Sequence, residues 1–359
     1  MINIFVPNGL RRNIILCTTR IISLVLLKSL RVSNTSWMEE RYINTQGANN
    51  STLKQDLTFR LARLSDFQEI MKMSKGIYNG HDYLPVRFHA WMKTENTAIM
   101  LSCCGEELVG LLVCSVVDEG RTFVSRAARI LPEFRGQGVH KKQGKAMDEF
   151  VRKTFPNVRR KRLTKQDESF PFGRKILQQD TLSCCVEKAT LRPHQMPTMS
   201  SVEIVPCGQD YLCDVIFAPR VRRNLFPDNV IVVEYFPFEP LRSNIDYLMQ
   251  EQDLYFAVEK CTDNVAPRSV SFGVLSPRVS KRVYWSATVY SSDPILYEAH
   301  LVHQFQQACE TIEDAFIFSC YQEKSLTRCG RRVFKEMFQT TLDEERSKKT
   351  MNLYEINFP

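Results

Sequence analysis

A short turn with two glycines is the part of this sequence best suited to chemistry. It lies in Ala128-Arg-Ile-Leu-Pro-Glu-Phe-Arg-Gly-Gln-Gly-Val-His140, between an apolar strand pattern that ends at Ile130 and a helical pattern. Glycine permits left-handed dihedrals and carries no side chain that would keep a ligand off the backbone. A helix N-terminus adds N–H donors and partial positive charge. The turn therefore predicts a diphosphate site on the backbone amides of Arg135, Gly136, Gln137, Gly138, Val139 and His140.

The elements that must position this turn alternate between strand and helix patterns. Residues 57–63 alternate as a strand does, and Ser65 with Gln68 has the spacing of a capping box that opens a helix. Pro85 suits the first turn of a second helix. Gly105 and Gly120 mark turns between the three strands that precede the loop. The pattern predicts strands at 57–63, 97–103, 107–117, 122–130, 160–164 and 182–186, with helices from 65, at 85–93 and from 139 to about 154. This is a mixed α/β sheet flanked by helices.

Residues 202–359 repeat a similar order of elements and indicate a diverged internal duplication. Strands are expected at 202–205, 231–235, 254–259, 269–275, 282–290, 315–321 and 352–357, and helices at 210–217, 241–249, 297–312 and 331–338. The passage that would correspond to the glycine turn, 289–296, contains no glycine and has Pro294 and Ile295 where amides should face a phosphate. We expect an extension and linker over 1–54, a first domain over 55–190, a linker over 191–201 and a non-catalytic second domain over 202–359.

Composition limits the class of protein. With 43% hydrophobic residues and no sustained heptads, the 359-residue chain is expected to form two domains with real cores rather than a coiled coil or a disordered chain. The 12 cysteines show no Cys-x-x-Cys spacing, which favours reduced thiols in the cytoplasm and argues against zinc. His300 and His303 lie one helical turn apart but have no third ligand nearby, so no metal is expected. The sequence does not set the oligomeric state.

The first 38 residues contain no Asp or Glu and carry five basic residues. Their apolar run, 21–27, is far shorter than the roughly 20 residues of a membrane span, so no membrane partner is expected. A disordered or alternatively spliced extension is the preferred interpretation. A mitochondrial transit peptide is the alternative, and with it a mitochondrial location.

The order of strands followed by Arg135-Gly136-Gln137-Gly138 and a helix resembles the Gcn5-related N-acetyltransferase (GNAT) superfamily, in which an R-G-x-G core binds acetyl-CoA. A closer resemblance, to vertebrate histidine N-acetyltransferase and its paralogues, is carried by residues 59–60, 66–67, 70–74, 76–85, 91, 117–120, 129, 135–139 and 162–164. It implies a GNAT fold followed by a degenerate GNAT-like domain. It also implies transfer of acetyl from acetyl-CoA, as co-substrate, to the α-amine of a free amino acid, histidine or a related acceptor, by direct attack in a ternary complex.

The resemblance implies roles for further residues. Backbone groups of Ile130 and Leu131 would polarise the thioester carbonyl and pair with the pantetheine arm. Asp118 and Glu119 are candidates for relaying the amine proton, or else residues of the turn before Gly120. Tyr78, Asp82 and Tyr83 lie in the segment that covers the acceptor, where Asp binds an ammonium and Tyr a carboxylate. Their alternative is a capped turn with two core aromatics.

Two departures leave other functions open. Arg126 stands where the family carries an acidic residue, and Lys175 where it carries a tyrosine suited to protonating the thiolate. A CoA-binding pseudoenzyme is therefore the first alternative. Residues 121–162 carry 13 basic and 3 acidic residues, a charge that attracts anionic CoA but also suits a nucleic-acid-binding module. We prefer CoA and expect no nucleic-acid partner, because basic residues flank the glycine turn and no nucleic-acid fold signature is present.

Overall fold

The described part of the chain is a large mixed sheet with helices on both faces. The computed structural model describes residues 57–166, 170–187, 202–262, 265–280 and 282–359, all within the unit Asn44–Pro359. The extension predicted over 1–54 and the linker over 191–201 lie outside these residues. No helix in the described ranges is long and apolar enough to cross a membrane.

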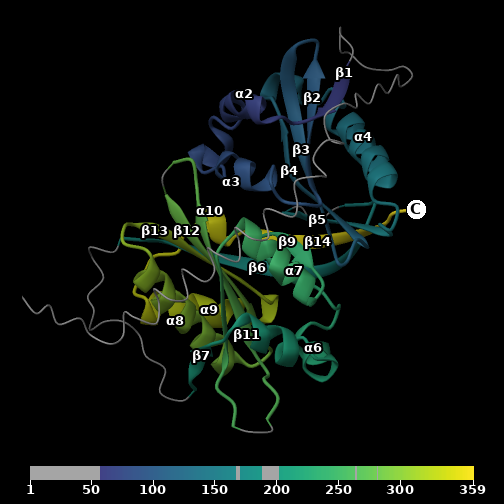
Figure 1. The fold of residues 1–359 in the computed structure, drawn as a ribbon. Coiled ribbons are helices and arrows are strands. Elements are labelled where there is room, and N and C mark those ends of the chain that lie inside the picture. Colours follow the sequence, from purple (N-terminus) through teal and green to yellow (C-terminus); the bar gives the residue numbers. More distant parts are fainter. Residues whose placement is uncertain (1–56, 167–169, 188–201, 263–264, 281) are drawn as a thin grey trace, which may run out of the picture. The chain divides into compact units, whose positions relative to one another are not determined.

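Twelve strands form one sheet in the order β1-β2-β3-β4-β5-β14-β6-β13-β12-β11-β10-β7 (Figure 1). The strands of the first half are β1 (Leu57–Leu61), β2 (Thr97–Cys104), β3 (Glu107–Val117), β4 (Thr122–Ile130), β5 (Arg160–Lys165) and β6 (Arg174–Val186). Those of the second half in this sheet are β7 (Ile204–Pro206), β10 (Leu254–Glu259), β11 (Val270–Pro277), β12 (Val283–Tyr290), β13 (Phe316–Gln322) and β14 (Thr350–Asn357). A separate hairpin joins β8 (Ile231–Val233) to β9 (Phe236–Phe238).

The strand order is symmetric about its centre, which supports an internal duplication. Reading inward from either edge, β1 to β5 correspond to β7 and β10 to β13, and each series has its single parallel pair at the same place, β4 with β5 and β12 with β13. The last strand of each half is exchanged. β14 lies beside β5, and β6 lies beside β13, and the two exchanged strands pair with each other. The division of the chain at 191–201 stays a prediction.

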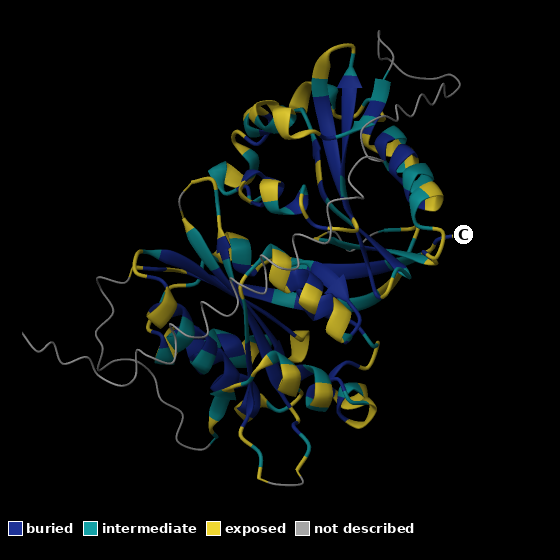
Figure 2. Cartoon of the chain, in the orientation of Figure 1, coloured by how far each residue is buried: buried dark blue, intermediate teal, exposed yellow. Residues whose placement is uncertain are grey.

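Helices cover both faces of the sheet. They are α2 (Phe67–Met73), α3 (Leu84–Trp91), α4 (Val139–Thr154), α5 (Gln209–Tyr211), α6 (Pro219–Leu225), α7 (Arg242–Glu251), α8 (Pro294–Thr311), α9 (Thr327–Arg332) and α10 (Glu344–Ser347). In the first half, α2 and α3 bury Ile70, Leu84 and Phe88 against the sheet. Helix α4 packs on β2, β3 and β4, and Figure 2 shows its other face exposed.

Local differences from the predicted elements have identifiable causes. The expected capping box of Ser65 and Gln68 does not form. Instead the Asp66 carboxylate accepts from the Arg63 N–H at 2.6 Å, and α2 begins at Phe67. Strand β6 is 13 residues long rather than five, because β13 and β14 both extend it by pairing. The strand expected at 231–235 is present but ends at Val233, where a two-residue turn at Glu234 and Tyr235 leads into β9.

Candidate active site

The glycine turn is open on the side of its amides. Gly136 and Gly138 adopt φ of 75° and 77°, and a Cβ at either position would meet no atom within 4 Å. Gly138 precedes α4, and in the described structure no side chain caps the 16-residue helix and no acidic residue lies in its first turn. The N–H groups of this first turn need an acceptor from outside the helix, so an anion fits there.

Two side chains of the turn bond to its own backbone. Arg135 Nε donates to Ile130 O at 3.1 Å, and Gln137 Nε2 donates to Glu133 O at 2.6 Å. Val139 is buried beneath the turn, where it anchors the start of α4. These hydrogen bonds hold the loop in its conformation, and no side chain of the described residues covers the backbone at Gly136 or Gly138.

A gap opens between β4 and β5 next to this turn. The two strands pair only where Thr122–Val124 meets Arg160–Arg162, although β4 continues to Ile130. A bulge at Ala127, with φ of 53°, shifts the register of β4 against β3. Bulges bend a strand and end its pairing. The later part of β4 therefore leaves β5, and its outer backbone groups face the gap.

The backbone N–H and C=O groups of Ile130 and Leu131 point in different directions. Leu131 N–H donates to Val109 O and Leu131 O accepts from Phe134 N–H, each at 3.0 Å. This removes Leu131 from the groups expected to bind the thioester. Alternate residues of a strand direct their N–H and C=O to opposite sides. Ile130 therefore directs its backbone groups away from β3, toward the gap, and the Arg135 guanidinium occupies its C=O.

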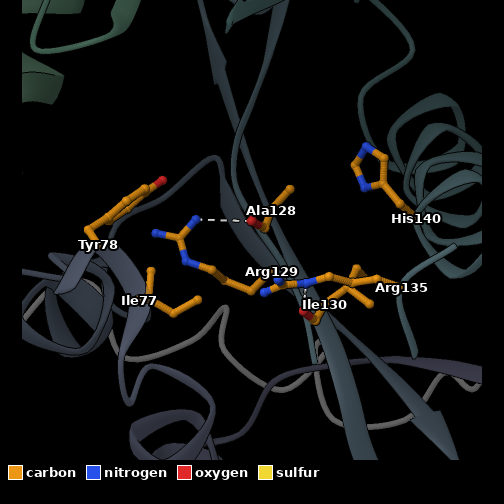
Figure 3. A pocket seen from close by; sticks show the side chains of 7 residues that line it. All are labelled: Ile77, Tyr78, Ala128, Arg129, Ile130, Arg135 and His140. Carbon is orange, nitrogen blue, oxygen red and sulfur yellow. Dashed lines mark hydrogen bonds between the residues drawn. The ribbon is translucent and has the colours of Figure 1, made fainter. Parts of the chain in front are cut away.

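A pocket of about 400 Å³ lies at this point (Figure 3). It brings together four predicted site residues, and its full lining is Ile77, Tyr78, Ala128, Arg129, Ile130, Arg135 and His140. A second pocket of about 440 Å³ shares Ile77, Tyr78, Ile130 and Arg135 and continues to Met73, Lys75, Gly76 and Pro132. The pockets extend from the glycine turn to the segment before α3.

Arg129 organises the side of the pocket that Tyr78 lines. Its guanidinium bonds to Asp82 Oδ1 at 2.9 Å and lies 5.0 Å from the Tyr78 ring and 5.5 Å from the Tyr83 ring. Asp82 is fully buried and also accepts from the Leu84 N–H. The expectation that Asp82 binds an ammonium is corrected, because Arg129 already neutralises its carboxylate. In the sequence analysis, Arg129 is only one of the positions that match the family. Its place near the end of the strand before the glycine turn was the signal that could have marked it as a site residue.

Tyr78 faces solvent at the mouth of the pocket, with 57% of its surface exposed. Its φ of 50° is unusual for a tyrosine, and Asn79 follows at 57°. The ring of Tyr83 stacks on that of Tyr78 with centroids 6.5 Å apart and meets Trp91 edge-on. Partial burial raises the pKa of the Tyr78 phenol despite the opposing Arg129 charge. Tyr78 is therefore a protonated hydroxyl donor at neutral pH.

Asp118 and Glu119 do not reach the pocket. Asp118 is fully buried, and its carboxylate accepts from Arg162, from the Glu239 N–H and from Asn244. Glu119 is exposed and pairs with Arg121 at 2.7 Å. Both residues have φ near 57°, as turn residues before Gly120. The structure thus favours the turn interpretation over the proton relay: Asp118 joins the β3–β4 turn to the second half.

His140 lies across the pocket from Tyr78 (Figure 3). Although His140 is exposed, partial desolvation lowers the pKa of its imidazole, and the charges of Lys161 and Lys165 lower it further. The ring is therefore neutral at pH 7 in a basic surrounding. A bound phosphate would offset those charges and favour the imidazolium.

The corresponding place in the second half is closed. Asp293 caps α8 with its own carboxylate, which accepts from the Ile295 N–H at 2.8 Å and the Leu296 N–H at 3.4 Å. Pro294 supplies no N–H, and β12 remains paired with β13 through Thr288. A carboxylate thus occupies the donors that a diphosphate would need, and the expectation that the second half is non-catalytic stays a prediction.

The two departures noted in the sequence lie outside the pocket. Arg126 is partly buried in the contact with α7, where it pairs with Glu251 at 2.7 Å and lies 4.5 Å from the Trp91 ring. Lys175 is exposed and donates to Gln178. His300 bonds to the hydroxyls of Ser269 and Ser271. Within the described ranges, no three His, Cys, Asp or Glu side chains are grouped as metal ligands.

Comparison with known proteins gives consistent similarities. Residues 199–323 match the family model described as "Histidine N-acetyltransferase, C-terminal". Histidine N-acetyltransferase of Scomber australasicus is 26% identical over 72% of this chain and 81% of its own length, and that of Xenopus tropicalis is 28% identical over 55% and 64%. A tandem GNAT protein from the clavulanic acid biosynthesis pathway superposes with a TM-score of 0.53 at 11% identity, covering 85% of this chain and 99% of that one.

Proposed function

Because the chain is a member of the GNAT superfamily related to the histidine N-acetyltransferases, and thus an acetyltransferase, we propose that it transfers acetyl from acetyl-CoA to the α-amine of a free amino acid, histidine or a close analogue. Acetyl-CoA supplies an activated acetyl thioester and a diphosphate by which it is held. Acceptor and donor react directly, with both bound at once.

The observation that carries this proposal is the open glycine turn at the start of α4, beside the gap between β4 and β5. The uncapped N–H groups suit a diphosphate, and the clear space over Gly136 and Gly138 lets it approach the backbone. Ile130 N–H is the strand donor directed at the gap, which suits a thioester carbonyl oxygen. Donors aimed at the oxygen that gains charge are the main source of catalysis in acyl transfer.

The acceptor is assigned to the Tyr78 side of the pocket. The α-ammonium of a free amino acid must lose a proton before the amine can attack, and a water or a side chain at the site must accept that proton. The Tyr78 hydroxyl and the Arg129 guanidinium suit the acceptor carboxylate, and Ala128 and Ile130 face the reacting groups across the pocket. These residues bind and orient the two substrates, which is how proximity lowers the barrier.

The basic segment 121–162 is a weaker argument for nucleic acid than its charge suggests. Arg160 pairs with Glu239, Arg162 pairs with Asp118 and Glu355, and Lys161 pairs with Asp148. Carboxylates of the same chain therefore neutralise the charges of these three side chains. A small-molecule acceptor is therefore preferred, and the absence of a nucleic-acid partner stays a prediction.

Two measurements test the proposal. Calorimetry should detect acetyl-CoA binding to the full chain, and thiol release should be stimulated by one or a few of the twenty amino acids, histidine first. Binding without stimulated release by any of them would identify a CoA-binding pseudoenzyme. Failure to bind acetyl-CoA would reject both. A cytoplasmic location, with the mitochondrial alternative, stays a prediction because residues 1–56 lie outside the described ranges.

A further inference from the structure

The turn of the β8–β9 hairpin is strained at both of its residues. Glu234 and Tyr235 have φ of 47° and 67°. Two-residue turns of this kind normally use Asn-Gly, because a left-handed backbone disfavours larger side chains. Such strain persists only where surrounding contacts impose it, and it is concentrated at functional sites. The contacts of these two side chains therefore indicate what the turn does.

Glu234 ties the second half to α3, the helix that follows the segment carrying Tyr78. Its two carboxylate oxygens accept from Arg87 of α3 and from Arg278, each at 2.7 Å, and all three side chains are about nine-tenths buried. Burial alone would raise the pKa of Glu234, but the two guanidinium groups outweigh it and lower that pKa. The Arg278 guanidinium also lies 5.2 Å from the Tyr83 ring, which stacks on Tyr78.

Tyr235 lies at the end of β5, where the gap opens. Strand β9 packs against both β4 and β5 (Figure 1), and Tyr235 O accepts from Thr164 Oγ1 at 2.8 Å. Among the groups that shift the pKa of Tyr78 after burial and Arg129 is the Tyr235 phenol, so the two hydroxyls belong to one electrostatic neighbourhood. The Tyr235 side chain is only partly covered, and burial raises the pKa of its phenol. It is therefore a protonated hydroxyl, and the side chains of Gln166 and Tyr321 lie within hydrogen-bonding reach of it.

Two hydroxyls without a hydrogen-bond partner in the described structure lie near Tyr235. Its ring meets Tyr321 edge-on at 5.3 Å, and Thr181 and Thr288 are the register partners of Tyr321 on either side. Residues opposite one another on neighbouring strands share a face of the sheet. The hydroxyls of Thr181 and Thr288, 4% and 1% exposed, find no partner among the residues that the structure describes. Buried hydroxyls in folded proteins normally have a hydrogen-bond partner, in the protein or in an ordered water, so these two call for an explanation.

We infer that the second half selects the acceptor, with Tyr235 as the specificity-determining residue that hydrogen-bonds the acceptor's polar side chain and Glu234 as the positioning residue that fixes the turn against Arg87 and Arg278. This rests on the proposed function. The acceptor class is an α-amino acid whose side chain both donates and accepts hydrogen bonds, as an imidazole or an amide does. A site that provides such groups rejects apolar analogues, because its own polar groups would then be left unpaired.

The test is Tyr235→Phe in the full chain, with Tyr255→Phe as a matched control. Tyr255 is also a partly covered tyrosine of the second half, and its hydroxyl bonds to His303. For Tyr235→Phe we expect a KM and a Kd for histidine raised about tenfold, as for the loss of one hydrogen bond. The ratio of kcat/KM for histidine over phenylalanine should fall similarly, with the acetyl-CoA Kd unchanged. Tyr255→Phe should change none of these.

The outcomes separate this inference from the proposed function. Calorimetry with histidine, on protein saturated with CoA, reads acceptor binding without turnover. Loss of that binding in Tyr235→Phe supports the inference even if no amino acid stimulates thiol release, which would reject the proposed function alone. Unchanged discrimination in Tyr235→Phe overturns the inference. So does a wild-type chain that binds no amino acid, or a variant that weakens acetyl-CoA and histidine equally.

Discussion

Placing a carboxylate at the glycine turn tests the acetyl-CoA site most directly. In Gly138→Asp the new side chain enters open space, because a Cβ there meets nothing within 4 Å. The left-handed φ of 77° makes the substitution cost about 1–2 kcal/mol of folding free energy. Near a diphosphate, each pair of like charges at about 4 Å costs from about 1 kcal/mol in water to about 4 kcal/mol at an effective dielectric of 20.

The expected result is an acetyl-CoA Kd raised between roughly 5-fold and 1,000-fold, measured by calorimetry. Gly120→Asp is the matched control. Gly120 has φ of 85° and the same open surroundings, but it lies in the β3–β4 turn. It should lose similar stability in chemical unfolding and keep its affinity for acetyl-CoA. Gly138→Asn separates charge from bulk, since it should weaken binding less than Asp does. Wild-type affinity in Gly138→Asp would refute the assignment of the turn.

Three further predictions follow from buried or partly buried ionisable groups. Arg126→Ala should lower the free energy of unfolding by about 3–5 kcal/mol, because the Glu251 side chain, 1% exposed, would lose its partner. Denaturant titration measures this loss. The double variant Arg126→Met with Glu251→Gln should lose clearly less stability, and an equal loss would contradict the ion-pair argument. Acetyl-CoA should bind more tightly as pH falls from 7 toward 5. The pKa of His140 is lowered in the free protein and a bound phosphate would raise it, so binding takes up a proton. The difference between the pH profiles of wild type and His140→Gln measures the contribution of His140, and identical profiles would exclude it. Burial lowers the pKa of His300 to about 3. The unfolded chain, in which the pKa is 6.5, therefore binds a proton more readily, and the stability of the fold declines as pH falls below 6.5. At pH 5 the free energy of unfolding should be lower by about 2 kcal/mol than at pH 7, and the same decline in His300→Gln would assign it to other groups.

Much of the first half could be predicted from the sequence because its signals are local. The alternation of apolar residues and the glycines at 105 and 120 predicted the meander from β2 to β4, and Gly136 with Gly138 predicted the open turn. The second GNAT-like half was predicted from the order of elements alone. The symmetric strand order supports that interpretation.

What the sequence could not predict depends on contacts between distant residues. Asp82 looked like a free carboxylate because Arg129, its partner, lies 47 positions away. Asp118 looked like a catalytic candidate because its partners Arg162 and Asn244 come from β5 and α7. The turn at Glu234 and Tyr235 was missed because neither residue is typical of a left-handed turn, and the contacts that hold them belong to other elements.

The exchange of β6 and β14 has a consequence for how the molecule is made. β5 has β14 as its outer neighbour, and β14 ends at Asn357, two residues before the C-terminus. An amino-terminal fragment ending near residue 190 would lack β14, so the backbone N–H and C=O groups along that edge of β5 would be unpaired. Such an edge strand can pair with another chain and cause aggregation. The first half therefore completes its part of the sheet only when β14, from the second half of the chain, has paired with β5. Splitting the gene between its repeats should yield aggregation rather than a smaller enzyme.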